Sequence, residues 1–476
     1  MPGLPLIPPL DARTPRSLSA GPKPGQKKSR DSGQRDGSET AHDPCDANSE
    51  PACSLGPGSV LRRGPYGAFF GGATITRPRI KPWIRVRGSP GMVGKSVSEI
   101  GFAAENPSAV SGTRPVMTET QEGKRMFAYV GGYTTPDRDG RADGIHVYRI
   151  DPQSGAWELC QHIEGLANPS LFTVRNDGRV LFSVHGGRDH VSAFRISPSD
   201  GHLTLLSQMP CQGSNPVDAA LDNDARHLVV ANYSSGTVAV MPLEPDGRML
   251  PVHQVHELTG MPGPDPVQQS ASHPHAVIFD PTGRFVIVPD KGFDCTFVFR
   301  FDYDTGRIEP AAQGCIASRP GAAPRHCIFH PLQPVLYVNN ELDSTVTAFA
   351  WNATDGTLTE LQTVGTLAQR HAGRNTTAEI GVTRDGRFLY VSNRGHDSIA
   401  RFAIADDGGL RLLGTTPTGG KRPRFFTLDP TGDFLFAANQ ESDNIVTFRV
   451  DKASGDLAPT GQVISFGSPA AISFVV

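Results

Sequence analysis

Short extended segments recur along the chain from Met126 to the C-terminus, and they are rich in Val, Ile, Phe and Tyr. The clearest group reads PRFFTLDP at 423–430, GDFLFAAN at 432–439 and DNIVTFRVD at 443–451, followed by a weaker segment. Its apolar positions alternate or form short runs, and they do not repeat with the helical period. This pattern predicts antiparallel strands in groups of four.

A glycine-containing turn separates the third and fourth segments of each group. It reads DPQSGAW in the first copy and DKASGDL in the last, and its glycines are Gly155, Gly201, Gly247, Gly306, Gly356, Gly408 and Gly455. Glycine tolerates the positive φ of tight turns, so we expect a hairpin at each of these positions. Groups of four strands that recur about every 50 residues predict the seven blades of an all-β propeller.

The phase of the repeat predicts how the ring closes. The first segment, FAYVGGY at 127–133, matches the second strand of later groups, whereas the last, SPAAISFVV at 468–476, matches a first strand. The C-terminal strand should therefore join the N-terminal blade, which leaves no seam of unpaired strand edges. We expect this seven-bladed β-propeller, with four antiparallel strands in each blade, to span residues 126–476.

Residues 1–125 have a different composition, rich in Pro, Gly, Ser and charge. They carry 18 Lys and Arg against 11 Asp and Glu, a net charge of +7. Such a sequence buries too little apolar surface to offset chain entropy, so we predict a disordered basic tail. The GMVGKS segment at 91–96 lacks the first glycine of a phosphate-binding loop, and we reject that interpretation. A start-site extension of the reading frame is a further hypothesis for this tail.

The remaining chain is acidic, because 27 of the 45 basic residues and 37 of the 48 acidic residues lie there. This charge argues against nucleic acid as a partner, since phosphate binding needs a basic face. The seven cysteines include no CxxC pair, which disfavours a disulfide framework or zinc knuckle and favours a reducing cytoplasm. The N-terminus lacks the features of a signal peptide, and no apolar run is long enough to span a membrane.

Propeller geometry predicts where chemistry could occur. First strands begin and second strands end on the same rim of the channel, and there the copies differ in polar identity. The charged and histidine candidates at these places are His273, His275, Arg325, His326, Glu341, Glu379, Arg394, His396 and Arg424. Converging Arg, His and Glu side chains could bind an anionic small molecule and move a proton. Each of them has the alternative role of a hydrogen-bond partner between blades.

Several catalytic classes lack a sequence signature. The chain has no GxSxG elbow, no well-placed Cys–His pair, no HExxH motif and no dense carboxylate set. Neither a covalent nucleophile nor a metal or other cofactor is therefore predicted. An oriented water, a base and cations are sufficient for lactone hydrolysis, in which arginine stabilises the developing oxyanion.

Longer stretches resemble the seven-bladed lactonase family, which includes bacterial 6-phosphogluconolactonases and fungal carboxymuconate cyclases. They are GGYT at 131–134, HPH at 273–275, PRH at 324–326, NNELDSTV at 339–346, NTTAEI at 375–380, GRFLYVSNRGHDSIA at 386–400 and ANQESDNI at 438–445. The resemblance implies a rim pocket whose catalytic residues are His275, Arg325, Glu341 and Arg394, with His275 or Glu341 as the base. The substrate-binding candidates are His273, His326, Glu379, His396 and Arg424.

We therefore expect a cytoplasmic enzyme that hydrolyses 6-phospho-D-glucono-1,5-lactone to 6-phosphogluconate in the pentose phosphate pathway. A lactonase or cycloisomerase acting on a muconate-type lactone and a non-catalytic binding propeller remain as alternatives. The expected partner is a small sugar lactone, with no nucleic acid and no membrane, and the sequence leaves the oligomeric state open.

Overall fold

The computed structural model describes residues 125–151, 154–368 and 371–476 of the chain. The predictions for the N-terminal tail and its GMVGKS segment concern residues 1–124, which lie outside this described part. Regular structure in the described residues is almost entirely β-strand, with one short 3-10 helix, η1 (Pro136–Arg138). None of the described helices is long and apolar enough to cross a membrane.

The described strands form seven sheets of four, as the sequence predicts. Blade 1 contains β28 (Pro469–Val475), β1 (Met126–Gly132), β2 (Gly144–Ile150) and β3 (Trp157–Glu164). Blade 2 contains β4 (Pro169–Val174), β5 (Val180–His185), β6 (His190–Ile196) and β7 (Leu203–Pro210). Blade 3 contains β8 (Pro216–Leu221), β9 (His227–Asn232), β10 (Thr237–Pro242) and β11 (Gln254–Glu257).

The other four blades follow the same order. Blade 4 contains β12 (Ile278–Phe279), β13 (Phe285–Asp290), β14 (Cys295–Asp302) and β15 (Arg307–Ala317). Blade 5 contains β16 (Pro324–Phe329), β17 (Val335–Asn340), β18 (Thr345–Asn352) and β19 (Thr357–Gly365). Blade 6 contains β20 (Thr376–Val382), β21 (Phe388–Arg394), β22 (Ser398–Ile404) and β23 (Leu410–Pro417). Blade 7 contains β24 (Pro423–Leu428), β25 (Phe434–Asn439), β26 (Asn444–Val450) and β27 (Leu457–Ser465).

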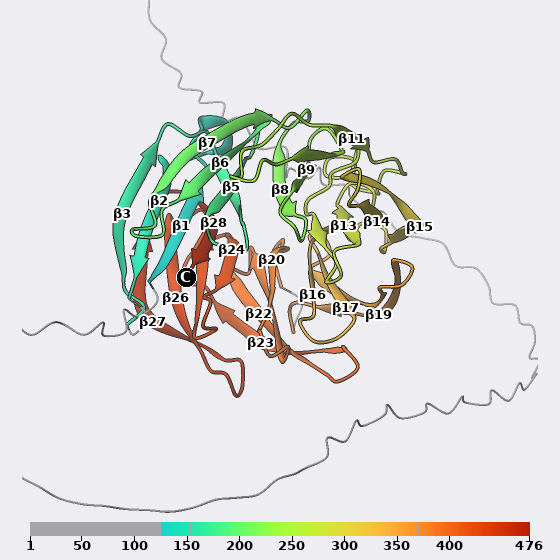
Figure 1. Cartoon of the computed structure of the whole chain (residues 1–476). Coiled ribbons are helices and arrows are strands. Elements are labelled where there is room, and N and C mark those ends of the chain that lie inside the picture. The colour runs from blue at the N-terminus through green and yellow to red at the C-terminus, as the bar shows by residue number, and fades with distance from the viewer. Residues whose placement is uncertain (1–124, 152–153, 369–370) are drawn as a thin grey trace, which may run out of the picture. The chain divides into compact units, whose positions relative to one another are not determined.

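The ring closes in blade 1 through the two ends of the propeller sequence. The C-terminal strand β28 pairs antiparallel with β1, and Phe127 lies opposite Val475. Figure 1 shows the red β28 beside the cyan β1, with the blades arranged in a ring. Every blade is therefore a complete sheet of four strands, and the predicted closure is confirmed.

The innermost strand of blade 4 is shorter than the repeat predicts. Near His273 the pairing is reduced to an isolated bridge between Pro274 and Asp290, and β12 begins only at Ile278. The Asp218 carboxylate of the neighbouring blade accepts a hydrogen bond from the Val277 backbone N–H over 2.9 Å. A side chain thus satisfies a backbone donor at the point where the regular ladder is interrupted.

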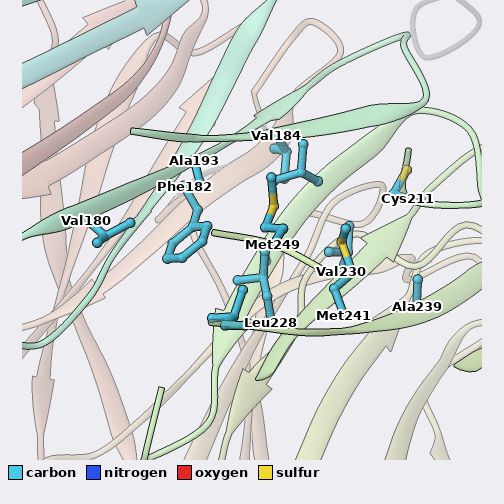
Figure 2. Close-up of a cluster of buried hydrophobic side chains, with 13 residues drawn as sticks. Val180, Phe182, Val184, Ala193, Cys211, Leu228, Val230, Ala239, Met241 and Met249 are labelled. Carbon is cyan, nitrogen blue, oxygen red and sulfur yellow. The ribbon is translucent and has the colours of Figure 1, made fainter. Parts of the chain in front are cut away.

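The core lies between the blades. Seven clusters of buried hydrophobic side chains occupy the seven blade-to-blade interfaces. Figure 2 shows the cluster between blades 2 and 3, where Phe182 and Val184 of β5 face Leu228, Val230 and Met249 of blade 3. Burying each large apolar side chain contributes about 1.5–3 kcal/mol, so the ring is held by contacts between neighbouring sheets.

The predicted hairpin glycines also pack between blades. Gly356 has φ +73, and a Cβ atom added there would lie 2.3 Å from the Phe285 ring of the preceding blade. The other six glycines of this set likewise have positive φ, and each faces the first or second residue of a second strand in a neighbouring blade. A tyrosine hydroxyl adds a hydrogen bond at three of these turns, as where Tyr337 donates to the Gly408 carbonyl over 3.0 Å. These turns are therefore structural elements of the ring.

Candidate active site

Two positions of the repeat bring polar side chains together at one rim of the channel. At the first position, Pro274, Pro324 and Pro423 lie at or just before the start of the innermost strand. They are followed by His275, Arg325 and Arg424. Proline suits this place because it starts a strand without needing to donate a ladder hydrogen bond. The side chains that follow it belong to different blades and share one end of the channel wall.

The second position lies at the end of the second strand. It comes one residue after the partner of the proline, or of the threonine that replaces this proline in blade 6. Asp290, Asn340 and Asn393 pair with Pro274, Pro324 and Thr377, and they are followed by Lys291, Glu341 and Arg394. Three consecutive blades therefore carry a cation, an anion and a cation at the equivalent position of the repeat. Glu341 and Arg394 were predicted from the sequence, and Lys291 was not, although VPDKG at 288–292 occupies the same repeat position.

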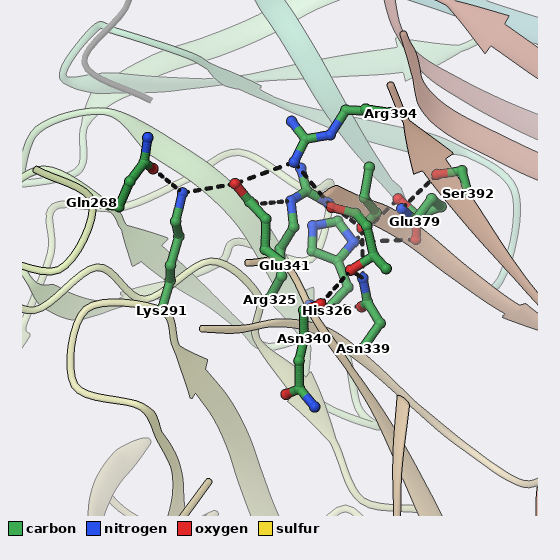
Figure 3. Close-up of polar contacts among 12 residues, drawn as sticks. Gln268, Lys291, Arg325, His326, Asn339, Asn340, Glu341, Glu379, Ser392 and Arg394 are labelled. Atoms are coloured by element: carbon green, nitrogen blue, oxygen red, sulfur yellow. Dashed lines mark hydrogen bonds and ion pairs between the residues drawn. The ribbon is translucent and has the colours of Figure 1, made fainter. Parts of the chain in front are cut away.

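Glu341 is the centre of this charged cluster. Its carboxylate lies 2.7 Å from Lys291 Nζ, 3.0 Å from Arg325 Nε and 3.1 Å from Arg394 Nη2. All four side chains are at most 5 % exposed. Figure 3 shows Lys291, Arg325 and Arg394 approaching Glu341, while Gln268 accepts a second hydrogen bond from Lys291 over 2.6 Å. One carboxylate thus holds three cationic side chains from three blades.

These cations decide the protonation state of Glu341. Burial alone would raise the pKa of this carboxyl, but attraction to Lys291, Arg394 and Arg325 outweighs burial and holds the pKa well below its ordinary value. Burial and the neighbouring Arg394 lower the pKa of Arg325 to about 10, so that guanidinium remains charged at neutral pH. Glu341 is therefore an ionised, fully paired carboxylate.

His275 lies beside this cluster in a different electrostatic state. Its side chain is buried, and its ring centre is 5.2 Å from that of His326 and 5.4 Å from that of Tyr233. Burial, followed by repulsion from Arg325 and His326, lowers the pKa of His275 well below its ordinary value. Among the described residues, no group makes a hydrogen bond to its Nδ1 atom. His275 is therefore a neutral imidazole within a cationic site.

A second histidine, which lines the same small cavity as His275, is paired with a carboxylate. His326 Nδ1 lies 3.1 Å from Glu379, and the Glu379 backbone N–H donates to Ser392 Oγ over 2.9 Å. Burial lowers the pKa of His326, and the attraction of Glu379 opposes this effect. Further along the channel wall is Asp218, whose pKa burial raises to about 7. Asp218 was not among the residues predicted from the sequence, because it belongs to no recognisable motif.

Cavities connect these groups along the channel. A space of about 20 Å³ is lined by His275, Arg325, His326, Arg424 and Tyr133, and this volume suits about one water molecule. A second cavity of about 450 Å³ shares His326 and Glu379 with the first and is lined by Asp218. A further cavity, of about 650 Å³, lies among turns such as those at Asp385 and Thr431, and none of the cations around Glu341 lines it.

The other predicted binding residues have different surroundings. Arg424 lines the smallest cavity, and its guanidinium lies 5.2 Å from the centre of the Tyr133 ring. His273 stacks on the Tyr233 ring at 4.4 Å, next to His275. His396 is exposed, and it hydrogen bonds to Ser398 and Asn375, which lie outside the cluster. The structure thus brings eight of the nine predicted residues to the cluster or its edge.

Comparison with known proteins shows the family to which this propeller belongs. The model of the family described as "Lactonase, 7-bladed beta-propeller" matches residues 127–474. The chain belongs to the seven-bladed β-propeller lactonase family. Its resemblance to this family, inferred from short motifs, is thereby confirmed over the whole propeller.

The matches between this lactonase and individual relatives extend over almost the full length of those relatives. A protein of Bacillus subtilis named 6-phosphogluconolactonase is 33 % identical over 355 residues, which are 74 % of this chain and 99 % of that protein. One of Formosa agariphila with the same name is 32 % identical over 69 % of this chain and 94 % of its own. The solved structure of a periplasmic gluconolactonase from Pseudomonas aeruginosa superposes with a TM-score of 0.69 and 33 % identity, over 74 % of this chain and 99 % of that one.

Proposed function

We propose that this lactonase hydrolyses 6-phospho-D-glucono-1,5-lactone to 6-phosphogluconate. The observation that carries the proposal is a neutral, buried histidine beside a cluster of cations held by one carboxylate. The names of the relatives from Bacillus subtilis and Formosa agariphila support the same substrate. A sugar lactone with a phosphate group needs cations for its negative charge and a base for water, and both kinds of group are present.

In the proposed reaction His275 acts as the general base. A water molecule attacks the C1 carbonyl carbon of the lactone while the imidazole takes up a proton from that water. The new oxygen–carbon bond produces a tetrahedral oxyanion, which guanidinium groups stabilise where the charge develops. When the bond between C1 and the ring oxygen breaks, the imidazolium returns its proton to the departing oxygen. The products are a carboxylate, a free hydroxyl group and one released proton.

The choice between His275 and Glu341 as the base follows from their protonation. A carboxylate paired with three cations has a very low proton affinity, because protonation would break three ion pairs. Glu341 is therefore assigned to positioning Arg325, Arg394 and Lys291. His275 is neutral at pH 7 and keeps a nitrogen lone pair for a proton.

Local charge supports binding of a phosphorylated substrate. Four positive charges come from Lys291, Arg325, Arg394 and Arg424. Glu341 and Glu379 contribute one negative charge each. This local excess opposes the acidic character of the propeller as a whole. Arg424, which lines the small cavity beside His275, is our candidate for the phosphate or the oxyanion.

Free gluconolactone is a second candidate substrate, because the similar structure from Pseudomonas aeruginosa is named a gluconolactonase. The test is a panel of freshly prepared phosphogluconolactone, free gluconolactone and a muconate-type lactone, followed by proton release below pH 7. We expect the largest kcat/KM for the phosphorylated lactone and a loss of about 10²–10⁴-fold in His275→Gln. His202→Gln, which changes a half-exposed histidine of another blade, is the matched control. Wild-type rates equal to spontaneous hydrolysis for every lactone would refute the proposal.

A cytoplasmic location is part of the same proposal. All five cysteines in the described ranges are free, including the exposed Cys160 and Cys315, as expected for a reducing compartment. The relative from Pseudomonas aeruginosa is named periplasmic, so fractionation of cells is the measurement that decides between the compartments.

A further inference from the structure

Two histidines and an aspartate meet on blade 1, far in sequence from the cations around Glu341. Asp143 directly precedes β2, His146 lies on β2, and His162 lies on β3. His146 and His162 are direct partners in the antiparallel pairing of these strands. Partners in a sheet point to the same face, so the two imidazoles project together and the aspartate closes the group from the strand entry.

The donor atoms of these side chains converge on one point. His146 Nε2 lies 3.0 Å and His162 Nε2 lies 3.2 Å from the same oxygen, Asp143 Oδ1. One donor atom from each residue can be chosen so that all three lie within 4.8 Å of one another. In a tetrahedral zinc site with bonds of about 2.0–2.1 Å, neighbouring ligand atoms are about 3.3 Å apart. The observed separations therefore need only small side-chain rotations to match such a site.

The other ring nitrogen of each histidine faces an oxygen. His146 Nδ1 lies 3.1 Å from the Tyr148 hydroxyl, and His162 Nδ1 lies 3.5 Å from Glu164 Oε1. Metal-binding histidines commonly use their second nitrogen in this way, because an outer acceptor fixes the ring and increases its basicity. The Phe466 ring, at 4.8 Å from His146, packs against the group on one side.

An ordinary surface ion pair accounts for this arrangement less well. His202 and Asp200, 3.6 Å apart on blade 2, form such a pair with one histidine for one carboxylate. On blade 1, two imidazoles face a single carboxylate oxygen, and a carboxylate also faces the far side of His162. A metal ion placed at this point would accept one donor atom from each of the three side chains.

We propose that Asp143, His146 and His162 form a binding site for a divalent transition metal ion, with Zn²⁺ as the best fit. Two imidazole nitrogens and one carboxylate oxygen are the donors that zinc prefers, whereas Mg²⁺ and Ca²⁺ prefer oxygen alone. Asp143 is 58 % exposed, which leaves a side of the site open for a water ligand. The proposal does not depend on the proposed lactonase function.

The position of the site indicates what the metal would do. It would connect β2, β3 and the chain that enters β2, in the blade that joins both ends of the propeller. A ligand that binds the folded state and not the unfolded state raises the melting temperature. Zinc would thus strengthen the closing blade of the ring.

The test is calorimetric titration of the full chain with Zn²⁺ after treatment with a chelator and desalting. We expect one saturable site in the wild type and in His202→Gln. His146→Gln, His162→Gln and Asp143→Asn should each lose that site, and Glu164→Gln should weaken it about 10-fold. The melting temperature should rise with zinc only in the proteins that keep the site. Melting of each variant without metal shows that it is folded, because these side chains are at least partly exposed.

Replacement of Zn²⁺ by Co²⁺ gives an independent reading of the ligands. Nitrogen and oxygen ligation predicts visible d–d bands without thiolate-to-cobalt charge transfer, which separates this site from a cysteine site. Either of two results would overturn the proposal: equal zinc stoichiometry in the wild type and in both histidine variants, or a cobalt spectrum dominated by thiolate bands.

Discussion

Glu341→Gln tests whether the carboxylate at the channel rim holds the site together. The substitution keeps the size of the side chain and removes its charge, which leaves Lys291, Arg325 and Arg394 buried without their shared anion. Removing one partner of a buried ion pair costs about 3–5 kcal/mol, because the remaining charge stays out of water. For a propeller of about 350 residues, with an unfolding entropy of about 2.1 cal/mol/K per residue, this cost corresponds to a fall of about 4–7 °C in melting temperature.

The assay is thermal and urea unfolding of the wild type and Glu341→Gln, with Glu158→Gln as the control. Glu158 forms an ion pair with Arg149 in which both side chains are more than half exposed, and its loss should leave the unfolding transition unchanged. The double variant Lys291→Met/Glu341→Gln should lose less stability than the sum of the losses in the two single variants. The expected coupling energy is about 0.5–3 kcal/mol, because one unpaired charge has been removed.

The pH dependence gives a second reading of the same interaction. The folded pKa of Glu341 is depressed, so its stabilisation is present above the unfolded pKa of about 4.3 and is lost as the pH falls through the lower folded pKa. The difference between the wild type and Glu341→Gln should therefore be largest near pH 7 and shrink below about pH 4. A Glu341→Gln protein that unfolds like Glu158→Gln at pH 7 would show that the cluster contributes no net stability.

Three further changes test the base, the channel and the ring closure. The lowered pKa of His275 predicts that kcat/KM stays constant as the pH falls to 6.5 and decreases only below it; a half-maximal rate above pH 6.5 contradicts the assignment. Asp218 has a raised folded pKa, about 7, so the folded state binds the extra proton and stability falls as the pH rises from about 4 to 7. Asp218→Asn should lose less stability than the wild type between pH 5 and pH 8 in urea unfolding, and equal losses would count against this. Deleting residues 469–476 removes β28 and should lower the melting temperature of the whole propeller, whereas deleting the exposed Val476 alone should not; an unchanged melt of the longer deletion would argue against closure.

The repeat made the fold predictable from the sequence. Each glycine turn, such as that at Gly356, requires positive φ and space beside a neighbouring blade, so its recurrence follows directly from the geometry of the ring. The closure of the ring was predictable as well, because the first segment lacks an innermost strand and the last segment supplies one. The interruption before β12 was not predictable, because it depends on a hydrogen bond from Val277 to Asp218 of another blade.

The site was predictable only where a charge or a histidine interrupted a repeated position. His275, Arg325 and Glu341 were found in this way. Lys291, in VPDKG at 288–292, was missed because its role depends on an ion pair with Glu341 of the next blade, which the local sequence does not reveal. Asp143, His146 and His162 form no spaced metal motif. Their proximity follows from the register of β2 against β3, which the repeat pattern alone does not determine.

The alternation of charge around the rim follows from the repetition of the backbone. Consecutive blades place equivalent residues side by side. A charged residue at one repeat position therefore lies next to the equivalent residues of the two neighbouring blades. Lys291, Glu341 and Arg394 occupy this position in blades 4, 5 and 6, and the anion lies between two cations. Two like charges side by side at this burial would repel each other without compensation. Since Arg325 and Arg424 add positive charge from the innermost strands, the group remains cationic although Glu341 is fully paired. A ring of equivalent positions can thus hold a buried carboxylate and still present positive charge to an anionic substrate.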